Sequence, residues 1–127
     1  MMSLYRTRGL RDVTVQVPPT ASRGATVTLR CLYDLEGDSL YMLKWYMGKE
    51  EFYRFVPKEL PPTRVFPLPG FDVDVGSSDA HQVVLRSVTL KMSGRYRCEV
   101  SADATFHTAM VARWMHVVGK YKRLHIF

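Results

Sequence analysis

Two cysteines are the residues of this chain best suited to covalent chemistry. Cys31 and Cys98 are its only cysteines and lie 67 residues apart. Each stands in an alternating run, "ATVTLRCLY" or "GRYRCEV", on the side that also carries apolar residues, so we expect both to be buried. Two such thiols form a disulfide in an oxidising compartment or stay as free thiols in a reducing one. A bond across this loop stabilises a fold by about 4 kcal/mol.

The loop "DLEGDS" carries the carboxylates that a calcium ion prefers. Asp34, Glu36 and Asp38 alternate within it, but the remaining ligands of a known calcium-binding loop are missing. A solvated loop explains the same three residues. We therefore predict no metal site here.

The other residues with catalytic or metal-binding chemistry are dispersed. The histidines lack the pairing or the cysteine neighbours that a zinc site needs; they are His81, His107, His116 and His125. The polar run from Ser77 to Asp79 does not fit a nucleophile elbow. We predict a protein without catalytic residues or a cofactor, and not an enzyme.

Short alternating segments, separated by turn residues, make up most of the chain. No helical period runs for ten residues, so we predict an all-β fold of eight or nine short strands. Residues 64–75 are broken by prolines, which is typical of an edge strand. The expected strands cover residues 12–17, 25–33, 40–47, 51–56, 81–90, 94–100 and 105–118.

A tryptophan between the two cysteines points to one fold. Trp45 follows Cys31 by 14 residues, and Tyr96 precedes Cys98 by two. The order Cys, Trp, Cys at this spacing is the signature of the immunoglobulin β-sandwich, with the tyrosine at the corner before the second cysteine. We expect Trp45, Tyr96 and Leu85 in the core and a disulfide between the cysteines. The segment between Trp45 and His81 is long enough for two extra strands, which predicts a variable-type sandwich of two antiparallel sheets.

The chain is basic, with a net charge of +6 and a pI near 9.5 over 127 residues. Its cations are scattered, and the one compact cluster is the C-terminal "GKYKRLH". A solvated surface explains this pattern, while a polyanion such as a glycosaminoglycan is the alternative partner. We expect no nucleic-acid partner. The disulfide predicts an extracellular protein. No apolar run follows the early positive charges, so no signal peptide is expected in this sequence. No apolar run is long enough to span a membrane, so no membrane anchor is expected in it either.

Several stretches resemble one family more closely than the fold requires. The stretches are "CLYDLEGDSLYMLKWY", "EFYRFVPKELP", "VFPLPG" and "SVTLKMSGRYRCEVSADATFHT". They resemble the first immunoglobulin domain of the beaten path family, whose members are insect neuronal recognition proteins. The resemblance implies a cell-surface or secreted module that binds an immunoglobulin-superfamily receptor of the sidestep type in axon guidance or cell adhesion. It covers residues 10–118, and it leaves 1–9 as a flexible non-family segment and 119–127 as a basic tail or shortened linker.

In variable-type domains the outer face of one sheet commonly pairs with another immunoglobulin domain. Alternation predicts which side chains of three strands point toward that face. In the strand "EFYRF", either Phe52 and Arg54 or Tyr53 and Phe55 point outward. Ordinary sheet packing is the alternative explanation of these aromatics, and a fragment without independent function is the third possibility beside recognition and polyanion binding. The predicted partner-binding residues are Met42, Lys44, Tyr46, Phe52, Tyr53, Arg54, Phe55, Arg97 and Glu99.

Overall fold

The computed structural model describes residues 10–119, which form nine strands and two short 3-10 turns. The predicted N-terminal segment and all of the predicted C-terminal tail except Gly119 lie outside the described residues. The strand count agrees with the prediction. The elements are β1 (Arg11–Gln16), β2 (Thr20–Ser22), β3 (Val27–Asp34), β4 (Leu40–Met47), β5 (Glu50–Phe55), β6 (Thr63–Val65), η2 (Val75–Ser77), β7 (Gln82–Leu85), η3 (Leu90–Met92), β8 (Gly94–Ala102) and β9 (Thr108–Val118).

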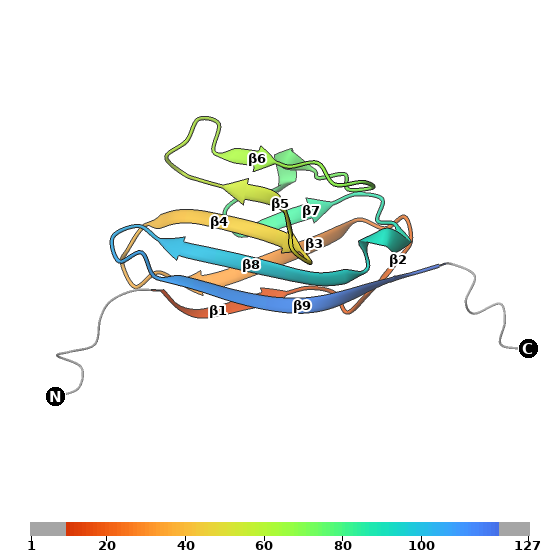
Figure 1. The fold of residues 1–127 in the computed structure, drawn as a ribbon, viewed down its shortest axis with the longest axis horizontal. Helices are drawn as coiled ribbons and strands as arrows, with labels where there is room; N and C mark the ends of the chain where they lie inside the picture. The colour runs from red at the N-terminus through yellow and green to blue at the C-terminus, as the bar shows by residue number, and fades with distance from the viewer. Residues whose placement is uncertain (1–9, 120–127) are drawn as a thin grey trace, which may run out of the picture.

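The strands form two sheets, one with the order β1-β3-β7 and one with the order β2-β9-β8-β4-β5-β6. Figure 1 shows β8 between β4 and β9, with β3 behind them. All strand pairs are antiparallel except β2 and β9, which are parallel. Pro18 and Pro19, which have no N–H for a ladder, separate β1 from β2 and let the chain pass from one sheet to the other. The parallel pairing covers only residues 116–118 of β9.

The predicted strand over residues 81–90 is shorter in the structure. Pairing with β3 ends at Leu85, because Ser87 adopts a left-handed conformation with a φ of 49° and η3 follows. The proline-broken stretch lies along the other side of β7, as an edge should. There the N–H of Asp74 donates to the carbonyl of Val84 at 2.8 Å, and Val73 bridges to Leu85.

The core lies between the sheets and contains every predicted signature residue. A disulfide joins Cys31 in β3 to Cys98 in β8 across a Cα separation of 6.3 Å. Trp45 pairs directly with Cys98 in the β4–β8 register and is fully buried. The hydroxyl of Tyr96 donates to the carbonyl of Met92 at 2.6 Å, which forms the predicted tyrosine corner. Leu85 is also fully buried. The sequence-based prediction of the core is therefore confirmed.

Across residues 10–119, no helix has the length and apolar character needed to cross a membrane.

Candidate binding face

The outward side chains of β4, β8 and β9 form a continuous surface because the three strands are neighbours in one sheet. Lys44 pairs across β8 with Glu99, and Tyr46 with Arg97; cross-strand partners share a face of the sheet. All five predicted residues of β4 and β8 thus lie together on one side. We call this surface the β4–β8–β9 face, made of Met42, Lys44, Tyr46, Arg95, Arg97, Glu99, Met110, Ala112 and Trp114.

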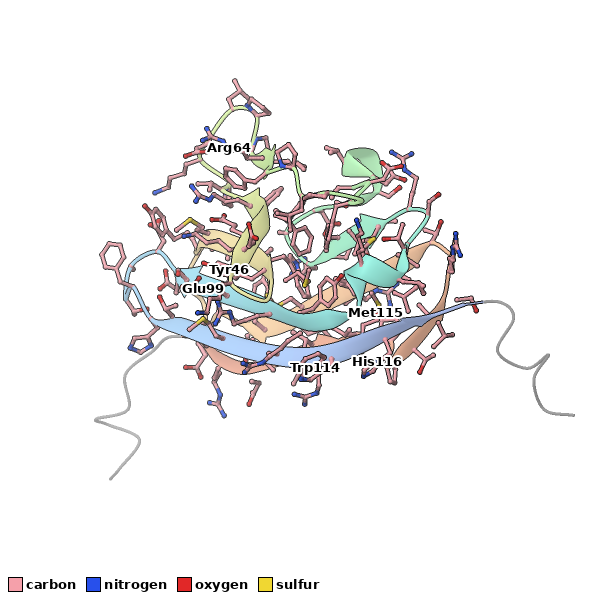
Figure 2. The ribbon with its side chains drawn as sticks, turned by 45° about the vertical axis from the view of Figure 1, so that its right-hand side comes forward. Tyr46, Arg64, Glu99, Trp114, Met115 and His116 are labelled. Carbon is pink, nitrogen blue, oxygen red and sulfur yellow. A yellow bond between two sulfur atoms is a disulfide. The ribbon has the colours of Figure 1, made fainter. Side chains whose placement is uncertain are left out.

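Tyr46 of β4 contacts two charged groups of the neighbouring strand β8 within the β4–β8–β9 face. Its hydroxyl donates to the Glu99 carboxylate at 2.6 Å, and the Arg97 guanidinium lies over its ring at 4.5 Å. Burial, and then the bond to Glu99, raises the pKa of Tyr46 to about 12. Figure 2 shows Tyr46 beside Glu99. The stack and the hydrogen bond restrict the positions of all three side chains.

These contacts do not give every N–H donor of Arg97 a hydrogen-bond acceptor. Its Nε is buried and has no hydrogen-bond partner among residues 10–119. A buried donor without an acceptor is costly.

Arg54 of β5 continues the surface beyond β4. It pairs with Lys44 on one side and with Arg64 of β6 on the other. Its guanidinium donates to both oxygens of Glu51, at 2.7 and 2.9 Å, and lies 5.2 Å from the centre of the Phe66 ring. Of the two orientations left open by the sequence, an outward Arg54 fits this geometry, and its charge is balanced locally by Glu51.

The prediction was wrong for the aromatic residues of β5. Phe52 and Tyr53 are both fully buried, and Phe55 packs against the core. The cause is a β-bulge: Trp45 pairs with Tyr53 but Tyr46 pairs with Glu51, so Phe52 is an extra residue. The bulge turns two successive side chains inward, which strict alternation does not allow. These three aromatics stabilise the sandwich and cannot form an exposed patch.

The sequence reasoning missed the contribution of β9. Trp114 is 60% exposed and Met110 is 53% exposed, and they pair with Arg95 and Glu99. Figure 2 shows Trp114 and His116 on the opposite side of β9 from the buried Met115. The signal was present in "MVARWMHVV", where alternation about the inward Met115 assigns Trp114 to the outside.

The acidic loop before β4 has a structural use. The Asp38 carboxylate accepts hydrogen bonds from the backbone N–H groups of Ser39, Ala104 and Thr105 and from the Thr105 hydroxyl. These bonds, first that from Ala104, lower the pKa of Asp38. Glu36 accepts a hydrogen bond from Arg11 at 2.9 Å. The loop therefore ties the turn between β8 and β9 to the start of β4.

The comparisons with known proteins support the fold. No protein-family model matches the chain, and no curated protein matches it. Among solved structures, murine CEACAM1b is similar with a TM-score of 0.65 and 23% sequence identity over 85% of this chain. The chain spans 54% of that structure's length. With the sheet order, the disulfide and the buried tryptophan, this likeness shows that the chain is a variable-type immunoglobulin β-sandwich.

Proposed function

We propose that this chain is the recognition module of a cell-surface or secreted protein and binds an immunoglobulin-superfamily receptor through the β4–β8–β9 face. The observation that carries the proposal is the composition of that face. It exposes Trp114 and Met110 beside the stacked pair of Tyr46 and Arg97. Tryptophan, tyrosine, methionine and arginine are the residues enriched where proteins bind one another.

The position of these side chains on a sheet supports the proposal further. The central strand β8 is paired on both sides, with β4 and β9, and is joined to the opposite sheet by the Cys31–Cys98 bridge. The backbone beneath these side chains is therefore already ordered before a partner binds. Less of the interaction free energy is then offset by ordering.

The resemblance to the beaten path family supports a finer proposal. The receptor would be of the sidestep type, and the setting would be axon guidance or cell adhesion. The division into residues 1–9, 10–118 and 119–127 stays a prediction. A disulfide persists in oxidising surroundings, which supports an extracellular location.

Surface plasmon resonance with the disulfide-intact protein tests the proposal. The ligands are sidestep-type ectodomains, and an unrelated immunoglobulin domain is the control. We expect saturable binding to one or two ectodomains that persists at moderate salt. Tyr46→Ala and Arg54→Ala should weaken it while the thermal unfolding temperature stays within a few degrees of wild type. No binding, or weak binding to every acidic surface that vanishes with salt, would overturn the proposal.

A further inference from the structure

We propose that the partner of the β4–β8–β9 face is an acidic protein surface, which presents carboxylates to Lys44, Arg95 and Arg97 and an apolar recess to Trp114. This inference deepens the function proposed above and rests on it. It follows from which charges of the face are already paired within the chain and which are not.

The acidic groups of this surface are already engaged. Glu99 accepts the hydroxyl of Tyr46 at 2.6 Å, and Glu51 is held by two hydrogen bonds from Arg54. A partner that offered cations to these carboxylates would compete with contacts made inside the domain. The acids therefore serve to position Tyr46 and Arg54.

The basic groups remain available. Lys44 and Arg95 form no ion pair with any residue from 10 to 119. Arg97 is stacked on Tyr46 at 4.5 Å, and its buried Nε has no acceptor within that range. A guanidinium held flat in this way offers a preorganised fork of donors to a carboxylate, which it binds more specifically than an ammonium does. The net charge of the face is positive, because Lys44, Arg95 and Arg97 outnumber the one carboxylate, Glu99.

The apolar end of the face favours a protein over a glycosaminoglycan. Arg95 pairs directly with Trp114, and Glu99 with Met110. These two apolar side chains are more than half exposed, at 60% and 53%. A sulfated polysaccharide would bind the cations by charge and leave these groups in water. A protein surface can cover both, which removes apolar area from water as well.

A second copy of this chain is a poorer partner. Two β4–β8–β9 faces brought together would each contribute the unpaired cations Lys44, Arg95 and Arg97, while Glu99 of each face already accepts the hydroxyl of Tyr46. Like charges opposed at an interface cost several kcal/mol. The face is therefore suited to a different protein, one of opposite charge.

Charge reversal at matched positions tests the inference. Lys44→Glu changes the face, while Arg30→Glu makes the same change on the exposed outer side of β3 in the other sheet. In binding to the ectodomains named above, Lys44→Glu should weaken affinity at least about tenfold and slow association. Arg30→Glu should stay within about twofold, since it alters only the long-range field.

Two further variants test the contributions of the stacked Arg97 and of the exposed Trp114 separately. Arg97→Lys keeps the charge and loses the fork, so we expect a loss of about fivefold or more. Trp114→Ala should raise the dissociation rate at least about tenfold and leave the salt dependence of association unchanged. Each variant is first checked for a wild-type thermal transition.

The outcomes distinguish the two proposals. If wild type binds an ectodomain and Lys44→Glu behaves like Arg30→Glu, the acidic-partner inference is overturned and the recognition function stands. If wild type binds no ectodomain, the recognition function fails and this inference fails with it. Binding only to heparin oligosaccharides, or a wild-type dimer in sedimentation that Trp114→Ala abolishes, would also overturn it.

Discussion

The outer faces of the two sheets differ in chemistry although they enclose the same core. The outer side of β1, β3 and β7 carries polar groups, one arginine, one exposed leucine and one buried valine: Thr14, Gln16, Thr28, Arg30, Leu32, Gln82 and Val84. Its arginine lies near a neutral amide, with Arg30 Nε 3.4 Å from Gln82 Oε1. The β4–β8–β9 face instead carries tryptophan, tyrosine, methionine and a stacked arginine.

The difference shows that exposure alone does not mark a binding surface. Leu32 is 40% exposed on the polar face, and single exposed apolar residues of this kind are ordinary. On the other face the exposed apolar groups are next to aromatic and charged groups held in place by one another. Changes in the shared core should affect both faces alike, and changes on the surface should affect only one.

Removal of the disulfide should have the largest effect, and should affect both faces. The double variant Cys31→Ala, Cys98→Ala loses the cross-link of a 67-residue loop, so we expect a decrease in the free energy of unfolding of about 4 kcal/mol. Guanidinium denaturation measures the decrease. Amide hydrogen exchange should become faster in β3 and in β8 together; faster exchange in one sheet alone would show that the sheets do not depend on one bridge.

The bulge in β5 gives the next largest effect. Phe52 is fully buried, so Phe52→Ala should lower the free energy of unfolding by about 3 kcal/mol. Phe55 is only partly buried at the rim of the core, so Phe55→Ala should cost about 1 kcal/mol. Urea denaturation of both variants gives the comparison. Equal losses would contradict the orientation that the bulge assigns to Phe52.

The two sheets each hold a partly buried tyrosine whose hydroxyl titrates at alkaline pH, Tyr33 in β3 and Tyr46 in β4. Burial raises the pKa of Tyr33 and of Tyr46 to about 12, from 10.0. Because the folded state favours the protonated form, the stabilisation is fully present below pH 10 and is lost as the pH rises from 10 to 12. Tyr33→Phe and Tyr46→Phe should each make this decline of unfolding free energy shallower. A decline unchanged in either variant would mean that the phenol titrates normally.

Surface truncations should have the smallest effect on stability. Trp114→Ala on the β4–β8–β9 face and Leu32→Ala on the polar face should each change the free energy of unfolding by less than about 0.5 kcal/mol. Thermal denaturation checks this. A large loss for Trp114→Ala alone would mean that the tryptophan supports the fold, and its exposure would then say little about binding.

The sequence predicted features that depend on regular alternation or on paired markers. Cys31, Trp45, Tyr96 and Cys98 are all where the signature places them. The same alternation correctly turned Tyr46 and Arg97 to one side of the sheet.

The errors arose where the backbone departs from alternation or where a strand was left without an assigned face. The bulge at Phe52 depends on how β5 pairs with β4, which is a contact between strands that a local pattern does not contain. The positive φ of Ser87 ends β7 early for a similar reason. Trp114 was missed although the pattern around Met115 was sufficient to place it.

Strand β2 pairs with only residues 116–118 of β9, and this short pairing affects the solubility of the protein. Among the described residues, β9 is paired with β8 over residues 108–115 but has no strand on its other side there. An open strand edge is a template for a strand of another molecule, and in concentrated solution it is where aggregation begins. Arg113 is exposed in this stretch and places a charge in the path of an incoming strand. Its replacement by an apolar residue should therefore lower the solubility of the protein before it alters the fold.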